Sequence, residues 1–312
     1  MNSTIAIDIG GTQMRAASYL INALEPLKIQ RIPTSGKSLS SEKRLSKLIE
    51  SVWPDKGDVL AIGVAAPGPV NPDTGVILSA PNIPQWEKFQ LRKHIEETFN
   101  SPTQIGNDGN LAAVGEWRFG AGKGYHNLIY LTISTGIGGG VIIDDRLLGG
   151  ANGLAGELGH VTVLPDGPVC SCGQRGHLEA VSSGPAIVRW VKEELTQGKS
   201  SNLLSTKTLT PKQIAIAAER GDELAQAAYQ RAGTFIGLAI VDFLHIFNPT
   251  AIIIGGGVSQ AGELLFAPIK EALPKYAFRP EYLTNLKVLK ASLGDDAGLM
   301  GALALTYDML SP

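Results

Sequence analysis

The chain has 312 residues, of which 44% are hydrophobic and 18% are charged, and its formal net charge is −2. This length suits one large domain or two medium ones, each with its own buried core. The balanced charge gives no sign of the basic surface that binds nucleic acid or anionic membranes, and no apolar run approaches the roughly 20 residues of a membrane span.

Four short apolar runs, rich in β-branched residues, predict strands at residues 5–9, 59–65, 128–133 and 251–254. Each run ends at glycine or at a small residue. Continuous apolar runs of this length are typical of strands that are buried on both faces of a sheet. The glycines cluster after such runs, which indicates tight turns at strand ends and not flexible linkers.

Helical patterns lie between the predicted strands. Most of them begin at a serine, threonine, asparagine or aspartate that can cap a helix, and two have proline in the first turn. Helices are predicted over residues 41–53, 90–100 and 109–119, from 184 and 211 onward, and from about 222 to 248. Strands that alternate with helices predict an α/β fold.

A weak internal repeat indicates which α/β fold this is. Residues 5–9 lead through a glycine turn into a second strand-like segment over 14–20, and residues 131–133 lead through 134–140 into 141–143. A Rossmann motif or a P-loop would instead lead into a helix. Two hairpins with phosphate-sized glycine turns, one in each half, predict the two-domain, ribonuclease H-like fold of actin and hexokinase, with a nucleotide and substrate cleft between the domains.

The first glycine turn is a candidate phosphate site. Gly10 and Gly11 let backbone N–H groups approach a phosphate closely, and Thr12 adds a hydroxyl donor. Asp8, at the end of the preceding strand, could hold Mg²⁺ through water. An ordinary Gly-Gly hairpin would have the same sequence, so both interpretations stay open at this point.

The second turn, over residues 134–140, has four glycines in its last five residues, more than a hairpin requires. Because each glycine loses backbone entropy on folding, close approach of a ligand explains the pattern better. A third glycine turn follows the strand at 251–254 and could lie flat against adenine and ribose, although a strand-to-helix turn also fits. The predicted nucleotide-binding residues of these two turns are Thr135, Gly136, Gly138, Gly139, Gly255, Gly256, Gly257 and Val258.

The pair Asn107-Asp108 is the catalytic candidate. Phosphoryl transfer to an alcohol needs a carboxylate that accepts the hydroxyl proton, and Asp108 would be that base. Aspartate is also a preferred residue at a helix N-cap. The two roles are compatible, because capping would orient the carboxylate.

The chain has only two cysteines, which excludes a framework of disulfides. The two cysteines are one residue apart, and two histidines lie near them in the sequence. A disulfide across Cys-x-Cys would be strained, so a tetrahedral zinc site explains this group of residues better than free thiols do. Such a closed site would be structural and would fix the loop that carries Glu157 and Glu179. These carboxylates are suited to sugar hydroxyls, although each could be a solvated surface charge. The zinc ligands would be His160, Cys170, Cys172 and His177.

Together these motifs resemble the ROK family (repressors, open reading frames and sugar kinases) over essentially the whole chain. The three glycine turns look like the family's two phosphate motifs and its adenosine motif, and residues 157–160 and 170–179 are similar to its sugar and zinc motifs. His177 stands where the family has a third zinc-binding cysteine. The resemblance implies an ATP-dependent sugar kinase with Mg²⁺ and a structural Zn²⁺. The residues that it places at the sugar are Gly68, Asn82, Asn107, Asp108, Glu157, His160 and Glu179.

Several functions within the family fit the resemblance. Residues 107–179 look most like the glucokinase members, which implies that Asp108 deprotonates the 6-hydroxyl of glucose. An N-acetylmannosamine or N-acetylglucosamine kinase is the alternative, because sequence does not reveal the shape of the sugar pocket. The family also includes sugar-responsive repressors with an added N-terminal helix-turn-helix segment, for which we expect no room before Asp8. A silent sensor is a further alternative, but Asp108 and both phosphate turns are present.

We expect a small domain over residues 1–118, completed by a C-terminal helix over 296–312, and a large domain over 119–295 with the zinc loop and the adenosine motif. The resemblance implies a homodimer or a homotetramer. The N-terminus enters an apolar segment at Ile5 without a basic leader. We therefore expect a cytoplasmic protein that binds a hexose and neither nucleic acid nor membrane.

Overall fold

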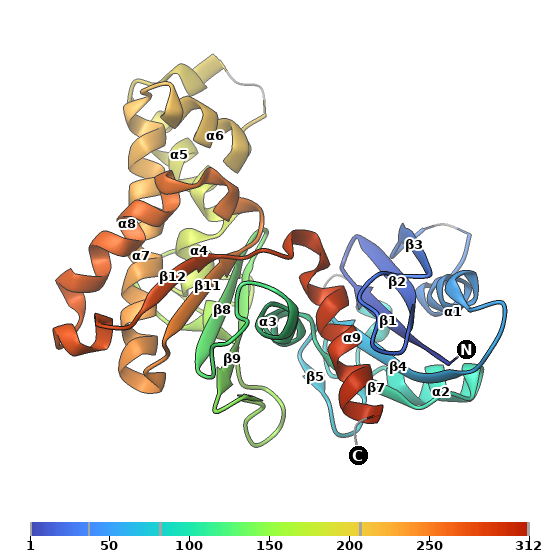
Figure 1. The fold of residues 1–312 in the computed structure, drawn as a ribbon. Helices are drawn as coiled ribbons and strands as arrows, with labels where there is room; N and C mark the ends of the chain where they lie inside the picture. Colours follow the sequence, from blue (N-terminus) through green and yellow to red (C-terminus); the bar gives the residue numbers. More distant parts are fainter. Residues whose placement is uncertain (1, 37, 81–82, 206–207, 311–312) are drawn as a thin grey trace. The chain divides into compact units, whose positions relative to one another are not determined.

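The computed structural model describes residues 2–36, 38–80, 83–205 and 208–310 (Figure 1). It divides into two compact units. The first contains Met1–Gly124, Leu147–Gly156 and Asp295–Pro312, and the second contains Tyr125–Arg146 and Glu157–Gly294. Residues 147–156, which the sequence predicts in the large domain, belong to the first unit.

The first unit is built on a five-stranded sheet in the order β3-β2-β1-β4-β7. β1 runs antiparallel to β2 and parallel to β4, which is parallel to β7. The carboxyl ends of the three parallel strands β1, β4 and β7 therefore meet at one edge of the sheet. There Asp8 pairs with Ala65, and the next residue of β4, Ala66, pairs with Asn107. The strands are β1 (Ser3–Ile9), β2 (Gln13–Leu20), β3 (Lys28–Pro33), β4 (Val59–Ala66) and β7 (Thr103–Asn107), and β5 (Val70–Asn71) pairs with β6 (Val76–Ile77) nearby in the chain.

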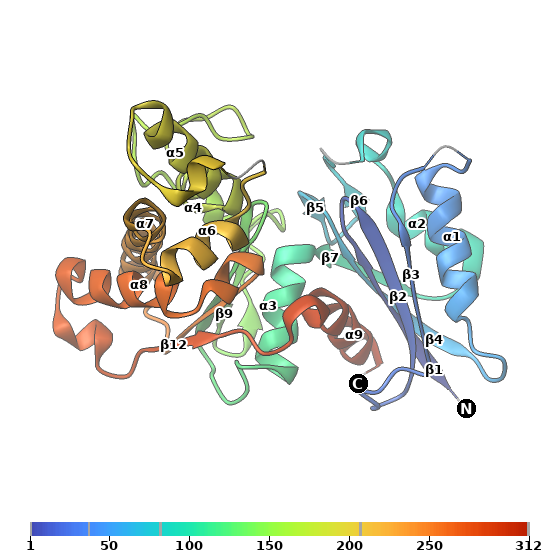
Figure 2. The ribbon, with the colours of Figure 1, turned by 90° about the horizontal axis from the view of Figure 1, so that it is seen from above.

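Helices cover both faces of this sheet (Figure 2). α1 (Ser41–Val52) and α2 (Leu91–Phe99) lie on one face, and α3 (Asp108–Phe119) and α9 (Ala297–Leu310) lie on the other. α1 buries Leu45, Leu48 and Ile49, whose spacing forms one apolar stripe. α3 and α9 approach closely because glycine stands at their contact: a Cβ on Gly115 would lie 2.4 Å from the Ala297 oxygen.

The sheet of the second unit repeats the plan of the first, in the order β10-β9-β8-β11-β12. β8 runs antiparallel to β9 and parallel to β11, which is parallel to β12. The strands are β8 (Leu128–Ile133), β9 (Ile137–Ile143), β10 (Arg146–Leu147), β11 (Ala251–Gly255) and β12 (Lys287–Lys290). Both predicted hairpins are present. β9 begins at Ile137, however, so the predicted turn over 134–140 is shorter, and Gly138 and Gly139 pair with Thr132 and Leu131 in the strands.

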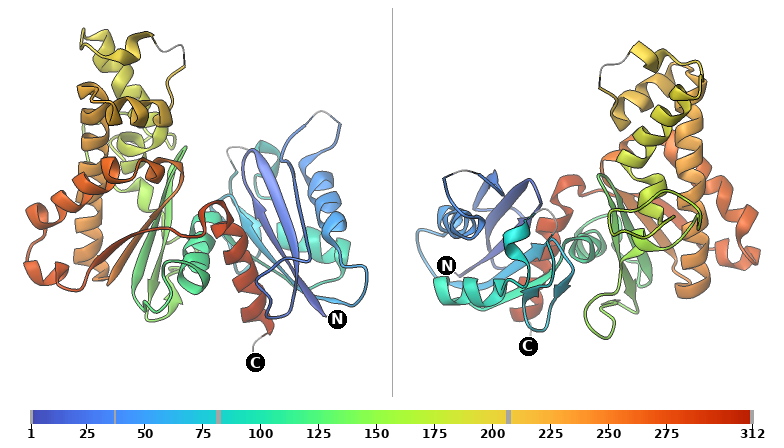
Figure 3. Two further views of the ribbon diagram at one scale, coloured as in Figure 1. Left: turned by 45° about the horizontal axis from the view of Figure 1, so that its top comes forward. Right: turned by 180° about the vertical axis from the view of Figure 1, so that it is seen from behind.

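The helices of the second unit pack around the long helix α7 (Glu223–Phe247), which contacts α4 (Leu178–Ser182), α5 (Gly184–Thr196), α6 (Pro211–Glu219) and α8 (Glu263–Tyr276) (Figure 3). α7 begins where Asp222 accepts a hydrogen bond from the Ala225 N–H at 3.0 Å, and it ends at Asn248 in the left-handed conformation. Short 3-10 helices complete the unit: η2 (Leu158–His160), η3 (Asn202–Ser205), η4 (Gly257–Ala261) and η5 (Pro280–Leu283). Within the described ranges, every helix is too short or too polar to cross a bilayer.

Candidate functional site

A cavity of about 630 Å³ opens in the second unit at the carboxyl ends of β8 and β11. The two strands are neighbours, with Gly255 opposite Thr132, so the segments that follow them share one edge. Ser134 and Thr135 line the cavity from the first segment, and Gly257 and Val258 line it from the second. The crevice beyond the carboxyl ends of parallel strands is the usual ligand site of such sheets.

Two glycines of the third turn, which follows β11, differ in why a side chain is absent. Gly256 has a φ of +82°, and a Cβ there would lie 2.4 Å from the Ile133 oxygen. A Cβ on Gly257 would meet nothing within 4 Å. Gly256 is thus required by packing against β8, whereas Gly257 leaves open space in the wall of the cavity.

Basic residues on the opposite wall were missed by the sequence analysis. Arg189 and Lys192 of α5 and Lys212 of α6 line the cavity, together with the helix starts at Gly184-Pro185 and Thr210-Pro211. In the sequence these basic residues resemble ordinary exposed charges on helices. Only the two proline-containing helix starts carry a signal in the sequence, and that signal indicates secondary structure alone.

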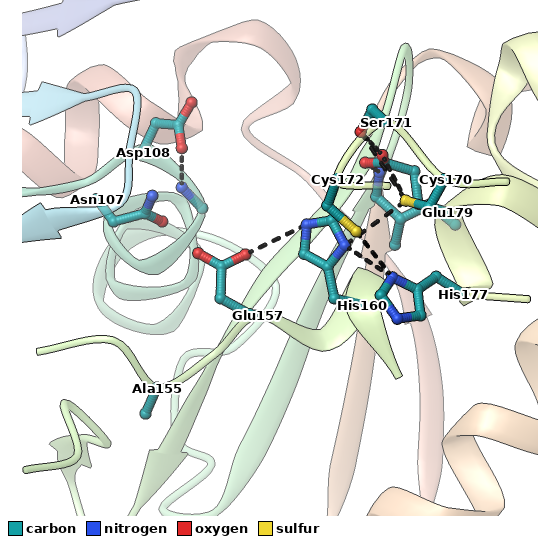
Figure 4. A network of polar contacts seen from close by, with 12 residues as sticks. Asn107, Asp108, Ala155, Glu157, His160, Cys170, Ser171, Cys172, His177 and Glu179 are labelled. Carbon is teal, nitrogen blue, oxygen red and sulfur yellow. Dashed lines mark hydrogen bonds and ion pairs between the residues drawn. The ribbon is translucent and has the colours of Figure 1, made fainter. Parts of the chain in front are cut away.

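Four side chains in the second unit form a candidate metal centre (Figure 4). His160, Cys170, Cys172 and His177 each offer one ligand atom, and all four atoms lie within 4.8 Å of one another. The Nδ1 atoms of the histidines are 3.2 Å apart, and each lies 3.3–3.7 Å from a cysteine sulfur. Tetrahedral zinc with ordinary bond lengths would separate its ligand atoms by roughly 3.3–3.7 Å, so these donors fit Zn²⁺.

Glu179 connects this metal centre to the second glycine turn. Its Oε1 accepts a hydrogen bond from the Ser171 hydroxyl at 2.8 Å, and its Oε2 accepts one from the Ile137 N–H at 3.0 Å. A Cβ on Gly136 would lie 2.4 Å from Oε2. The glycine at 136 therefore makes room for the carboxylate. Glu157, in contrast, is half exposed, with its Oε2 3.9 Å from His160 Nε2.

In the first unit, the carboxyl edge of the sheet carries the predicted catalytic pair. The helix cap is Asn107, whose Oδ1 accepts from the Asn110 N–H at 3.2 Å. Asp108 is the first helical residue, which corrects the expectation that it would itself be the cap. Its side chain is exposed, and Oδ1 accepts from the Gly109 N–H at 2.8 Å. Gly68 lies against this pair, since a Cβ there would be 2.8 Å from Asn107 Nδ2.

Asp8 forms an ion pair that the sequence analysis did not identify. Arg15 is directly opposite Asp8 in β2. Its Nη2 lies 2.6 Å from Asp8 Oδ2, and its Nη1 lies 3.0 Å from Asp296 Oδ1. Burial alone would lower the pKa of Arg15, but the hydrogen bond to Asp8 and the negative charges of Asp8, Asp296 and Asp295 outweigh it, so the pKa is raised. The signal was present in the hairpin register, because a tight turn over 10–12 places residue 15 across from residue 8.

The first turn is also held from outside its hairpin. The Gly10 N–H donates to the Gln13 oxygen at 2.8 Å, and the buried Thr34 donates its hydroxyl to the Gly10 oxygen at 2.6 Å. The Thr34 N–H donates to the Thr12 oxygen at 2.9 Å, while the Thr12 side chain is exposed, beside Gly11.

Comparison with known proteins shows to which family the chain belongs. It matches the model of the ROK family over residues 4–309. The chain belongs to the ROK family. It is 38% identical over 308 residues to a glucokinase of Halalkalibacterium halodurans, covering 95% of this chain and 92% of the relative. It is also 35% identical to a xylose repressor of Caldicellulosiruptor bescii, over 81% of this chain and 64% of the repressor.

A solved structure supports the same placement. The ROK family glucokinase from Streptomyces griseus, in complex with glucose and AMPPNP, superposes with a TM-score of 0.82 at 34% identity, over 97% of this chain and 98% of that one. The predicted fold is thereby confirmed: this ROK protein has the two-sheet α/β fold of the actin and hexokinase class.

The predicted site residues fall into separate groups in this ROK chain. Thr135, Gly257 and Val258 line one cavity, and the four predicted zinc ligands form one cluster. Gly138, Gly139 and Gly255 lie within strands and outside the lining. A Cβ on Gly139 would be 2.3 Å from the Tyr130 oxygen, so close strand packing accounts for that glycine. Asn82 lies outside the described residues.

Proposed function

We propose that the protein is an ATP-dependent kinase that transfers the γ-phosphoryl group of ATP to the 6-hydroxyl of glucose. The observation that carries this proposal is the cavity that the second and third glycine turns line together. It occurs in a chain that is 38% identical to a glucokinase over almost its whole length.

The cavity suits a nucleoside triphosphate. The hydroxyl groups of Ser134 and Thr135 can donate hydrogen bonds to phosphate oxygens, and the open wall at Gly257 can accept a flat base. Lys192 and Lys212 add positive charge to the same cavity. In phosphoryl transfer the protein contributes mainly positioning and neutralisation of phosphate charge, and these groups are suited to both.

Asp108 would act as the general base for the sugar hydroxyl. Its exposed carboxylate is oriented by the hydrogen bond from the Gly109 N–H. Asn107 supports this orientation, since its cap fixes the first turn of α3. The proposed sugar contacts are Gly68, Asn82, Asn107, Glu157, His160 and Glu179, and the proposed phosphate contacts of the first turn are Gly10, Gly11 and Thr12.

Two metal ions accompany this proposal. His160, Cys170, Cys172 and His177 would hold a structural Zn²⁺, whose effect would be to fix the loop that Glu179 joins to the second turn. Mg²⁺ would neutralise phosphate charge. Asp8 would meet a hydrated Mg²⁺ through its second oxygen, because Oδ2 already contacts Arg15.

The decisive variant is Asp108→Asn. We expect turnover to fall by about 100- to 10,000-fold, because the proton acceptor is lost, while glucose affinity changes little. A coupled ADP-release assay gives turnover, and calorimetry with AMPPNP present gives glucose affinity. Asp55→Asn, at an exposed aspartate paired with Lys28, is the matched control. Near wild-type turnover in Asp108→Asn would remove Asp108 as the base.

The choice of sugar is tested separately. The same assay with glucose, mannose, fructose, N-acetylglucosamine and N-acetylmannosamine should give the highest kcat/KM for glucose. A preference for either N-acetyl sugar would replace glucose in the proposal and leave the kinase assignment intact.

We also infer from kinship that the protein is a cytoplasmic homodimer or homotetramer that binds no nucleic acid. Light scattering on the purified protein measures the assembly, and a monomer would contradict it. A gel-shift assay with operator-like DNA tests for nucleic-acid binding, and a shifted band would contradict the inference that the protein binds none.

A further inference from the structure

A second cavity, of about 310 Å³, lies in the second unit. Three segments form it: the loop between the metal ligands, α5 and α7. Its lining includes three arginines, which are Arg175 from the loop, Arg189 from α5 and Arg231 from α7. The first cavity shares Arg189 with it.

Each arginine is held in place by the backbone. Arg231 Nη1 donates to the Val181 oxygen at 3.0 Å, Arg175 Nη1 donates to the Gly167 oxygen at 3.2 Å, and Arg189 Nη2 donates to the Ala180 oxygen. A guanidinium group has five N–H donors in a rigid fork. One bond to a carbonyl therefore fixes each group and leaves further donors for a ligand.

Aromatic rings fix the guanidinium of Arg231 further. Its central carbon lies 5.8 Å from the centre of the Trp190 ring and 5.0 Å from that of Phe235. Trp190 also lines the cavity. Arg231 is thus held by stacking and by one hydrogen bond, an arrangement that pre-organises it for an anion at little cost in side-chain entropy.

The charges of the cavity favour an anion. The three arginines face two lining carboxylates, Asp166 and Glu193, both of which are exposed, whereas Arg189 and Arg231 are half-buried. Burial lowers the pKa of Arg231, and the nearby positive charge of Arg189 lowers it further. Glu193 Oε1 lies 3.8 Å from Arg189 Nε, and the negative charge of Glu193 offsets only part of the downward shift in the pKa of Arg231. A bound anion would relieve the remaining repulsion between Arg189 and Arg231.

We propose that this second cavity binds a phosphate group, either as inorganic phosphate or as the phosphate of a small phosphorylated sugar. Arginine forks match phosphate oxygens in geometry, and the cavity volume accommodates a molecule larger than phosphate alone. This site adjoins the proposed nucleotide cavity, with which it shares Arg189, but Arg175 and Arg231 line only the second cavity.

Calorimetry on the whole protein tests the proposal. Inorganic phosphate is titrated with AMPPNP, Mg²⁺ and glucose at saturation, so that the proposed active site is filled. We expect saturable binding that weakens by at least about tenfold in Arg231→Met and in Arg175→Gln, because each loses a charge-assisted contact. The control is Arg279→Gln, at an exposed arginine stacked on Phe278 at 5.5 Å, which should bind phosphate like the wild type.

Glucose 6-phosphate in the same titration distinguishes the two ligand sources. Tighter binding than phosphate, with the same dependence on Arg175 and Arg231, would identify a sugar phosphate, and equal binding would identify phosphate itself. Absence of saturable binding, or binding unchanged in both variants, would overturn the proposal. If Arg231→Met fails to fold, the exposed Arg175 carries the test. Failure of AMPPNP to bind would count against the proposed function and not against this site.

Discussion

The two five-stranded sheets share their strand order, but the glycine turns of their first hairpins are supported by different contacts. The first turn is held by the Asp8–Arg15 ion pair across its own hairpin and by the buried Thr34, which directly follows β3 of the same sheet. The second turn is held by a carboxylate from another segment, that of Glu179 in the first turn of α4. The same strand order is therefore combined with two kinds of support: an ion pair within the hairpin and a neighbouring residue in the first unit, and a carboxylate more than 40 residues away in the chain in the second.

Arg15→Met should break the support of the first turn and have the largest effect on stability. It leaves Asp8, whose side chain is 19% exposed, without its cation. Removing one partner of a fully buried pair costs about 3–5 kcal/mol. Because Asp8 is partly exposed, the free energy of unfolding from urea denaturation should fall by slightly less, about 2–4 kcal/mol.

Arg31→Met is the control for this change. Arg31 pairs with Arg15 in the register of β2 and β3, but its side chain is exposed. Its replacement should alter the free energy of unfolding by less than about 0.5 kcal/mol. Equal losses in the two variants would show that the ion pair does not support the turn.

Gly136→Ala should disturb the second turn by a smaller amount. The added Cβ would lie 2.4 Å from Glu179 Oε2, so the flexible carboxylate must move and lose its bond to the Ile137 N–H. We expect a loss of about 1–2 kcal/mol in unfolding free energy and a higher KM for ATP. The control Gly124→Ala adds a Cβ that meets nothing within 4 Å, although its φ of +84° carries its own strain. It should leave the KM unchanged, and a shift of KM in the control alone would contradict the role of Glu179.

Asp222→Asn changes the N-cap of α7, a helix of the second unit. Of the three changes it should have the smallest effect on the free energy of unfolding. Burial would raise the pKa of Asp222, but hydrogen bonds from Ala225, Asn202 and Ser201 outweigh it and lower the pKa. The ionised carboxylate is therefore favoured in the folded state. Its stabilisation is complete above the unfolded pKa of about 3.9 and is lost as the pH falls through the folded value.

The measurement for Asp222→Asn is the free energy of unfolding as a function of pH. We expect a loss of about 1 kcal/mol near neutral pH, because a charged cap is replaced by a neutral one. The difference from the wild type should shrink as the pH falls below about 4. A constant difference at all pH values would show that the charge of Asp222 contributes nothing.

The sequence predicted those features that depend on local patterns. The apolar run at 5–9 and its glycine turn predicted the first hairpin, and the Cys-x-Cys segment with its two histidines predicted that the four candidate metal ligands lie together. Asp108 was expected as the cap, but its neighbour Asn107 caps α3, because two adjacent residues with similar propensity cannot be ranked from sequence.

Features that depend on distant contacts were not predicted. Glu179 was expected at a sugar, and nothing near it in the sequence indicates its bond to the Ile137 N–H. Lys192 and Lys212 reach the same cavity as Thr135 only because the sheet and two helices bring them there. Residues 147–156 pack with the first unit, in part through the bond from Asn110 to the Ala155 oxygen at 3.1 Å.

The assembly of the first unit from three separate stretches has a consequence for synthesis on the ribosome. The strands of its sheet precede the second unit in the sequence, yet α9, which packs against β1, β4 and α3, follows that unit. The second unit needs nothing beyond Gly294. Domains usually fold in the order of their synthesis. Here the unit that begins first should be completed second, because the face of its sheet that α3 and α9 cover together (Figure 2) is covered by α3 alone until α9 has been synthesised.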